Sequence, residues 1–339
     1  MVKSPYDFLA LNVINHLPEL NIMKISRIFL LLILVTNHVY SQLYNEDLRF
    51  TSSEYFSNTQ IDSLKNITYG NAIDYLGELQ ALKMDFYFPK NNEDTLTFRP
   101  FILLIHGGGF RGGSRESMTY HCTEFAKRGF VVATMSYRLG FDKTLRGDNI
   151  KAVYRAQQDT NTAIEYLVSE ADKLKIDPSG VFIGGSSAGA ITSQFIAYAS
   201  QAEWNQVMPQ IESDLGPLNA TEGVTIKGIY NNKGSVSPFA LKQGELVPTI
   251  SFHGELDQVV PIDKSVVTGY GSREIHKLLT QAGVCNDLTI VPDGGHGIYK
   301  SYDGANFRIN RVACFFKSLI LDTCVDFLAS EDIPAKCSN

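Results

Sequence analysis

A serine among small residues follows an apolar stretch in the middle of this 339-residue chain. Residues 181–184 predict a buried strand, and Gly185-Ser186-Ser187-Ala188-Gly189 comes directly after it. Glycines at both ends of a G-x-S-x-G pattern allow a sharp strand-to-helix turn that exposes the middle hydroxyl. The frame that starts at Gly185 makes Ser187 the candidate nucleophile, because a frame centred on Ser186 would end at Ala188 and lack the second glycine.

Two later segments carry the side chains that a nucleophilic serine needs. Strand-like residues 248–254 lead to Asp257, and residues 288–292 lead to His296. A histidine can take the proton of the serine hydroxyl and pass it to a leaving group, while a carboxylate holds the imidazole in the required tautomer. We therefore expect Ser187, Asp257 and His296 to act together in acyl transfer.

Backbone donors for a developing oxyanion are expected on a glycine-rich loop. Residues 101–105 predict another buried strand, which runs into His106 and three glycines. A tetrahedral intermediate needs donors that are already in place, and backbone N–H groups free of side chains can supply them. We expect the N–H groups of Gly108, Gly109 and Ala188 to do so, with His106 holding the loop rather than transferring protons.

The chain order Ser187, Asp257, His296 is the order found in α/β-hydrolases. With the HGGG loop at 106–109, it makes the chain from about residue 80 to 321 resemble carboxylesterases of the α/β-hydrolase superfamily. The likeness is greatest to HGGG-bearing esterases, which include hormone-sensitive-lipase-like enzymes and acetyl and feruloyl esterases of carbohydrates.

Three further details bear on this resemblance. Tyr137 and Arg138 follow a predicted strand as in the Tyr-Arg turn of these enzymes, and we expect them to orient the loop. Many relatives carry an acidic residue where this chain has Ser186, so the subfamily and its substrate stay open. Glu255 is an alternative acid to Asp257, which we prefer because Val-Val-Pro follows it, as in the acid loop of the family.

The alternation of strand-like and helix-like segments predicts an α/β fold with a mostly parallel central sheet and helices on both faces. We expect strands at 82–88, 101–105, 130–136, 181–184, 226–230, 247–253 and 287–292, and helices near 115–128, 150–175, 188–199, 271–281 and 305–321. Only residues 231–247 separate two of the strands, so we expect no large cap domain. Residues 201–224 can form at most a small partial cover.

The termini are expected to lie outside the catalytic domain, residues 80–321. Residues 1–41 read as a leader whose signal peptide spans about 23–41, with Met23 as the expected working start. An uncleaved membrane anchor is the alternative reading of this leader. We expect residues 42–79 to wrap the surface before the sheet begins and residues 322–339 to form a C-terminal tail.

Composition and cysteines set further bounds. With 44% hydrophobic and 19% charged residues and a net charge of -6, the chain is an ordinary globular protein with no basic face for a nucleic acid. Among its five cysteines we predict a Cys285–Cys324 disulfide, and we interpret Cys122 and Cys314 as buried apolar residues. Metal-ligand spacing is lacking, so we expect no metal and no other cofactor.

These features predict a secreted or periplasmic serine carboxylesterase without stable membrane insertion after signal cleavage. The expected substrates are small or carbohydrate esters with short acyl groups, acetyl or feruloyl among them. An amidase or peptidase of the same fold, a lipase, and a non-catalytic binding protein on a hydrolase scaffold are the alternatives. His121, His253 and His276 are interpreted as surface or packing residues.

Overall fold

The computed structural model describes residues 47–219, 221, 224–242, 246–298 and 301–330. Contacts divide the chain into two units, Met1–Asp47 and Leu48–Asn339, and the second unit carries the α/β fold. The predicted signal peptide at about 23–41 lies outside the described residues, so its prediction stays a prediction. None of the helices in the described ranges is long and apolar enough to cross a membrane.

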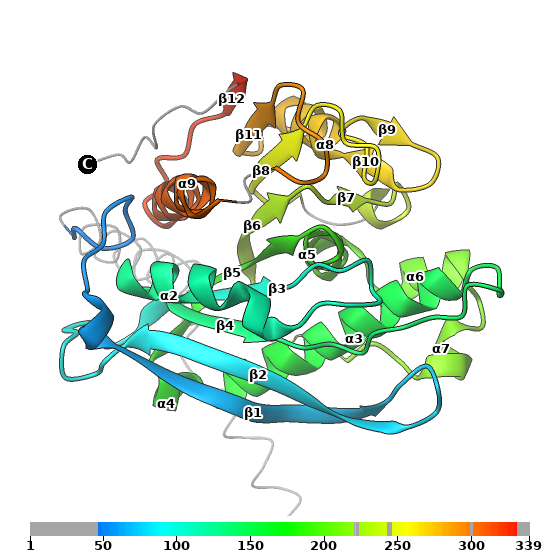
Figure 1. The fold of residues 1–339 in the computed structure, drawn as a ribbon, viewed down its shortest axis with the longest axis horizontal. Coiled ribbons are helices and arrows are strands. Elements are labelled where there is room, and N and C mark those ends of the chain that lie inside the picture. The colour runs from blue at the N-terminus through cyan, green and yellow to red at the C-terminus, as the bar shows by residue number, and fades with distance from the viewer. Residues whose placement is uncertain (1–46, 220, 222–223, 243–245, 299–300, 331–339) are drawn as a thin grey trace, which may run out of the picture. The chain divides into compact units, whose positions relative to one another are not determined.

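A nine-stranded sheet runs through the described part of this unit (Figure 1). In sheet order the strands are β1 (Ile61–Ile73), β2 (Leu79–Pro89), β4 (Val131–Met135), β3 (Arg99–Ile105), β5 (Ile176–Ser186), β6 (Ile226–Asn232), β8 (Thr249–Gly254), β11 (Asn286–Val291) and β12 (Phe327–Ser330). β1 pairs antiparallel with β2, and β2 with β4, whereas the other neighbouring pairs are parallel. The predicted mostly parallel sheet is confirmed.

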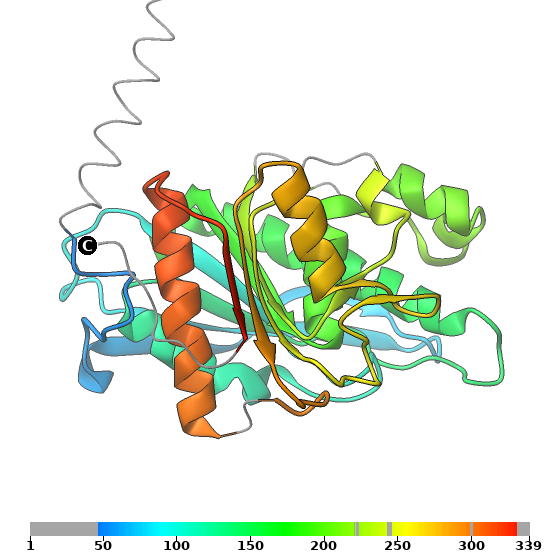
Figure 2. The ribbon, with the colours of Figure 1, turned by 90° about the horizontal axis from the view of Figure 1, so that it is seen from above.

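Helices cover both faces of the sheet, as predicted. α2 (Thr119–Lys127) and α9 (Tyr302–Ile320) pack together on one face, while α3 (Asp148–Ser169), α5 (Ala188–Tyr198) and α8 (Ser272–Gln281) lie on the other. Figure 2 shows α9 and α8 on opposite sides of the strands. Parallel strands between two layers of helices are covered on both faces and are mostly apolar, and β3, β4 and β8 are accordingly buried along their whole length.

Short elements complete the described fold. They are the helices α4 (Ala171–Leu174), α6 (Gln201–Val207) and α7 (Ile211–Leu215), the 3-10 turns η2 (Asn58–Gln60), η3 (Arg115–Met118) and η4 (Ala240–Lys242), and a small sheet in the order β7 (Ser235–Val236), β10 (Gly269–Gly271), β9 (Lys264–Ser265). The helix predicted at 150–175 is therefore two helices, which separate at Glu170. Between β6 and β8 the described residues form only β7 and η4, and no cap domain is built from them.

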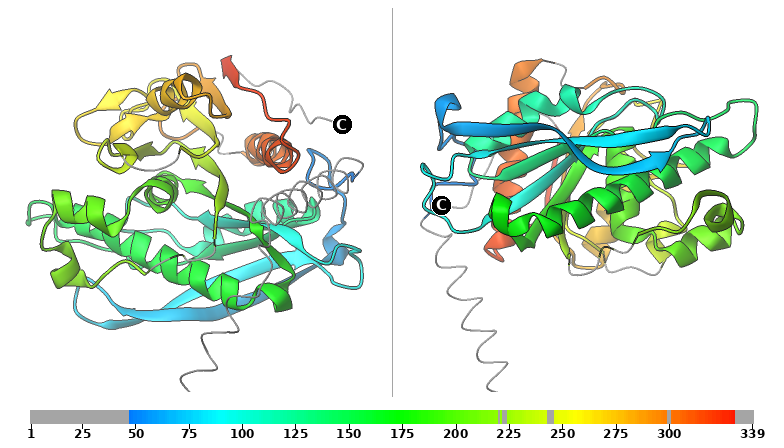
Figure 3. Two further views of the ribbon diagram at one scale, coloured as in Figure 1. Left: turned by 180° about the vertical axis from the view of Figure 1, so that it is seen from behind. Right: turned by 90° about the horizontal axis from the view of Figure 1, so that it is seen from below.

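The sheet extends further at both edges than the sequence indicated. Residues 42–79 were expected to precede the sheet, but β1 lies within them and pairs with β2 over its length (Figure 3). β1 is an edge strand with mostly exposed side chains and two register shifts, so it lacks the regular apolar alternation of a buried strand. β12, in the expected tail, pairs with β11.

The cysteines agree with the predictions in part. Cys285 and Cys324 form a disulfide, as predicted, and they precede the parallel strands β11 and β12. Cys122 is a free, buried thiol. Cys314 was interpreted as a simple apolar residue, which was wrong, because it is disulfide-bonded.

Candidate active site

Ser187 lies at the junction of β5 and α5 in a strained backbone conformation. Its φ is 55° and its ψ is -119°, a combination that a non-glycine residue rarely adopts. Its N–H donates to the carbonyl oxygen of Asn232 at 2.9 Å. A Cβ on Gly185 would lie 2.3 Å from the carbonyl oxygen of Ile105, and one on Gly189 would lie 2.0 Å from it. Any larger residue at position 185 or 189 would therefore clash with the backbone of β3.

The side chains of Ser187, His296 and Asp257 meet where β5, β8 and β11 end. His296 Nε2 lies 2.9 Å from Ser187 Oγ, and His296 Nδ1 lies 2.6 Å from Asp257 Oδ2. This is the arrangement in which imidazole can accept a hydroxyl proton while a carboxylate orients the ring. Ser186 instead lies beside Asn232, whose side-chain amide donates to its hydroxyl at 3.2 Å.

Asp257 is held as an ionised carboxylate. Its Oδ1 accepts the N–H groups of Val259 at 2.9 Å and Val260 at 3.0 Å. Burial by itself would raise the pKa of Asp257, but hydrogen bonds from His253, His296 and these backbone groups outweigh burial and hold the pKa well below its ordinary value. A carboxylate that stays charged can stabilise an imidazolium next to it.

Glu255, the alternative acid, faces elsewhere. It is exposed, and its carboxylate lies 3.9 Å from the guanidinium of Arg273. The contact with His296 is made by Asp257, whose side chain is fully buried.

The glycine loop after β3 lies against the serine turn. A Cβ on Gly107 would lie 2.6 Å from the carbonyl oxygen of Ser186 and 3.4 Å from Ser187 Cβ. Gly108 and Gly109 have φ values of 124° and 61° and are exposed. Within the described part of the chain, neither of their N–H groups donates a hydrogen bond to the protein.

Ala188 provides a third N–H at this position. It is the first residue of α5, and an N–H there has no acceptor within its own helix. The positive end of the α5 dipole lies at the same place, which favours negative charge there. The predicted donors thus lie on two segments that both adjoin Ser187.

His106 is buried beneath the loop. Its Nδ1 lies 2.7 Å from the carbonyl oxygen of Gly107, and its ring stacks on Tyr137 at 4.5 Å between centroids. The Tyr137 hydroxyl donates to the carbonyl oxygen of His106 at 3.0 Å. Burial lowers the pKa of His106, so the ring is neutral and suits a structural role at the base of the loop.

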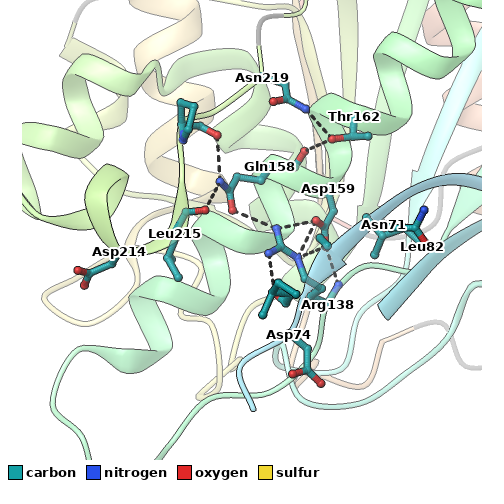
Figure 4. A pocket seen from close by; sticks show the side chains of 13 residues that line it. Asn71, Asp74, Leu82, Arg138, Gln158, Asp159, Thr162, Asp214, Leu215 and Asn219 are labelled. Carbon is teal, nitrogen blue, oxygen red and sulfur yellow. Dashed lines mark hydrogen bonds and ion pairs between the residues drawn. The ribbon is translucent and has the colours of Figure 1, made fainter. Parts of the chain in front are cut away.

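Arg138 contacts α3 and β1. Figure 4 shows its guanidinium beside Asp159 and Gln158, with 2.7 Å to Asp159 Oδ1 and a hydrogen bond to Gln158 Oε1. The guanidinium also donates to the carbonyl oxygen of Ile73. These residues border a cavity of about 550 Å³ between β1, α3 and the segment that follows α7. Arg138 therefore ties the turn after β4 to α3 and β1.

One residue of the site was not predicted from the sequence. His253 was interpreted as a surface or packing residue, but it is fully buried and its Nε2 lies 3.3 Å from Asp257 Oδ2. The sequence feature that could have indicated this contact is the position of His253 at the end of the strand that leads to Asp257. No group of three or more His, Cys, Asp or Glu residues suited to a metal ion occurs among the described residues.

Part of the chain matches a known family model. Residues 84–234 match the model named BD-FAE, and the match includes the glycine loop and Ser187 but ends before Asp257. Among curated proteins, neuroligin-like protein glit-1 of Caenorhabditis elegans is 31% identical over 122 residues, or 36% of this chain and 16% of that protein. Gut esterase 1 of the same species is 33% identical over 119 residues, or 34% of this chain and 20% of that protein. The chain thus matches only a fifth or less of these relatives' length.

Solved structures with a similar fold include esterases. Est2 from Thermogutta terrifontis superposes with a TM-score of 0.55 at 18% identity and covers 79% of this chain and 95% of that chain. Esterase B from Lactobacillus rhamnosis, solved with a tributyrin phosphonate inhibitor, has a TM-score of 0.55 at 16% identity and covers 90% and 97%. These structures show that the chain has the α/β-hydrolase fold, and the family model and the curated relatives show that it is similar to carboxylesterases.

Proposed function

We propose that this protein is a serine carboxylesterase that hydrolyses soluble esters through an acyl-enzyme. The observation that carries the proposal is the continuous hydrogen-bonded line from Ser187 Oγ through His296 to Asp257. The Ser187 end of this line lies beside the glycine loop, in which the N–H groups of Gly108 and Gly109 donate to no acceptor in the described part of the protein. Binding alone does not require a strained serine that is hydrogen-bonded to a base and an ionised acid.

The mechanism follows from these contacts. Ser187 Oγ attacks the ester carbonyl carbon while His296 Nε2 takes its proton, and Asp257 stabilises the imidazolium. The N–H groups of Gly108, Gly109 and Ala188 stabilise the oxyanion. When the tetrahedral intermediate collapses, the bond to the alcohol oxygen breaks and His296 protonates the departing alkoxide. Water, deprotonated by His296, then attacks the acyl-enzyme, which releases the acid and restores Ser187.

We further propose short acyl groups, about two to six carbons, as the preferred class. The described residues between β6 and β8 form no lid that could cover an extended apolar surface. The Thermogutta terrifontis esterase has been solved with propionate and with butyrate bound, which is consistent with a small acyl site on this fold. Acetyl or feruloyl esters of carbohydrate are the natural substrates that we propose, because the chain resembles esterases that act on them.

The test combines active-site labelling with a substrate series. A serine-directed phosphonate should label Ser187 and abolish hydrolysis of p-nitrophenyl esters, while Ser187→Ala should take up no label. kcat/KM should be highest at acyl chains of about two to six carbons. A maximum at long chains, or activation by an oil interface, would show a lipase instead. Faster hydrolysis of matched anilides would show an amidase.

We also propose that the protein acts outside the cytoplasm, after cleavage of the leader near residue 41. The Cys285–Cys324 disulfide and the bonded state of Cys314 suit an oxidising compartment. N-terminal sequencing of the exported protein tests this proposal. A mature chain that still contains residues 23–41 would contradict it.

A further inference from the structure

His253 lies at the end of β8 with both ring nitrogens in polar contacts. Its Nε2 lies 2.7 Å from the carbonyl oxygen of Val260 and 3.3 Å from Asp257 Oδ2. Its Nδ1 lies 2.7 Å from Ser272 Oγ at the start of α8. The side chain has no exposed surface. A buried histidine with this set of neighbours is constrained in both rotamer and tautomer.

The neighbours determine where the protons lie. Nε2 faces two acceptors, the Val260 carbonyl and the Asp257 carboxylate, so it must carry a proton. Ser272 Oγ accepts from the side-chain amide of Asn231 at 3.1 Å, which leaves the Ser272 hydroxyl proton for His253 Nδ1. The amide orientation of Asn231 is itself set by the N–H of Gly234, which donates to Asn231 Oδ1 at 3.0 Å. Donation thus runs in one direction, toward Asp257.

This chain of donors completes the surroundings of the carboxylate. Oδ1 receives the two backbone N–H groups of the acid loop, and Oδ2 receives His253 as well as His296. A carboxylate with its lone pairs occupied on both oxygens cannot rotate without losing several hydrogen bonds at a buried site. The orientation of His296 depends on that carboxylate.

We propose that His253 is a positioning residue for hydrolysis, which holds Asp257 Oδ2 in place for His296 through the donor chain Asn231–Ser272–His253. The proposal rests on the proposed esterase function. His253 touches neither substrate nor reacting atoms, so its effect must appear in kcat and in the hydrogen bond between His296 and Asp257. KM should change little.

Four variants separate positioning from stability. His253→Gln keeps an N–H donor at the position of Nε2, whereas His253→Leu keeps an apolar volume without a donor. Ser272→Ala removes the donor to Nδ1. Ser251→Ala is the matched control, because Ser251 is buried on the same strand and accepts from the same Asn231 amide at 3.1 Å, but it leads to no part of Asp257.

Each variant is measured for kcat, KM, melting temperature and the low-field proton resonance of His296 Nδ1–H, assigned by its loss in His296→Ala. In His253→Leu we expect that resonance to move and kcat to fall by up to about 10²-fold, the scale of a slightly misplaced catalytic group. His253→Gln should recover most of both, and Ser272→Ala should lie between. Ser251→Ala should keep the resonance and kcat of the natural protein.

Unchanged kcat and resonance in His253→Leu would overturn the proposal, as would an equal loss of kcat in Ser251→Ala. If His253→Leu does not fold, Ser272→Ala decides in its place, since a natural resonance and kcat in that variant would also overturn the proposal. Failure of the proposed function gives a different result. The natural protein would then hydrolyse no ester and take no phosphonate label, while the resonance would still report on the role of His253.

Discussion

At the scale of single residues, backbone conformation separates the two serines of the G-x-S-x-G turn. Ser187 has a positive φ, and its Oγ lies 2.9 Å from His296 Nε2. Ser186 is the last residue of β5, and its hydroxyl accepts a hydrogen bond from the side-chain amide of Asn232. Strain of this kind persists only where the surrounding structure holds it. At both ends of this turn the neighbouring backbone leaves no room for a Cβ atom, so only glycine fits at these two positions.

This difference predicts opposite behaviour for two neighbouring substitutions. Ser187→Ala should lower kcat by at least about 10³-fold, because covalent catalysis is lost while substrate binding remains. Ser186→Ala should keep most of the activity, since it loses only the contact with Asn232. Steady-state kinetics of both variants on one short-acyl ester is the measurement. The reverse pattern would mean that the turn presents the other serine.

The two carboxylates of the acid loop are predicted to differ as strongly. Asp257→Asn should lower kcat by about 10⁴-fold, because an amide no longer enforces the tautomer of His296 or stabilises the imidazolium. Glu255→Gln should have little effect, since Glu255 is exposed and contacts Arg273. The lowered pKa of Asp257 means that its charge survives to pH values below the ordinary carboxyl range. Comparable losses in the two variants, measured by kcat near neutral pH, would contradict this assignment.

At the scale of elements, the site depends on how closely α5 approaches β3. Gly189 lies in the first turn of α5, and its α-carbon faces the carbonyl oxygens of Ile105 and His106. A methyl group there would be closer to backbone atoms than real contacts allow. The glycine therefore brings the helix N-terminus and the glycine loop to the same serine.

Gly189→Ala should consequently lower both stability and activity. Its Cβ would lie 2.0 Å from the carbonyl oxygen of Ile105, so β3 and α5 must move apart, at a cost of about 1–3 kcal/mol or more. Gly295→Ala is the control for stability, because a Cβ there meets nothing within 4 Å. Thermal unfolding of both variants tests the prediction. An unchanged melting temperature in Gly189→Ala would show that the two elements are packed less closely.

At the scale of the whole molecule, one disulfide joins the end of the sheet opposite the site. Cys285 precedes β11 and Cys324 precedes β12, so the bond ties the last two strands together at their N-terminal ends, with 39 residues of sequence separation. His296 follows the other end of β11. The disulfide is therefore placed to affect stability without touching the chemistry.

Replacing both cysteines should separate these two properties. The double variant Cys285→Ser, Cys324→Ser should lose about 2–4 kcal/mol of unfolding free energy, because the unfolded chain gains freedom. Its kcat at 25 °C should match that of the natural protein. Denaturant unfolding and steady-state kinetics on the same preparation provide the check. A large fall in kcat with full folding would mean that β12 influences the site.

Acid stability should depend on His121, a histidine in α2. Burial, with a smaller contribution from the charge of Arg308, lowers the pKa of His121 to about 4 in the folded protein. An unfolded histidine has a pKa of about 6.5, so between these values the unfolded state binds more protons and stability falls as pH falls.

The melting temperature should therefore drop between pH 7 and pH 5 in the natural protein, and drop less in His121→Gln. The comparison of the two pH differences removes any general effect of pH on the fold. An equal drop in both proteins would show that other groups control acid stability.

Much of this molecule follows from local patterns in the sequence. The apolar runs at residues 101–105 of β3 and 181–183 of β5 predict buried parallel strands, because a strand covered on both faces is mostly apolar. Glycines at 185 and 189 predict the serine turn, because only glycine tolerates so close an approach of backbone to backbone. The order of serine, acid and histidine along the chain needs no structure to be seen.

Contacts between segments that are distant in the sequence were decided only by the tertiary structure. No local pattern predicts that β1 belongs to the sheet, since an exposed edge strand lacks the apolar alternation of a buried one. The disulfide bond of Cys314 is not predicted either, since a cysteine in a helix has the same local sequence whether or not it is bonded. The contact of His296 with Asp257 rather than Glu255, and the place of His253 beside that carboxylate, arise only when the ends of β8 and β11 meet. A hydrogen bond requires its donor and acceptor atoms to be placed to within a few tenths of an ångström, and the spacing of residues along a chain does not specify such positions.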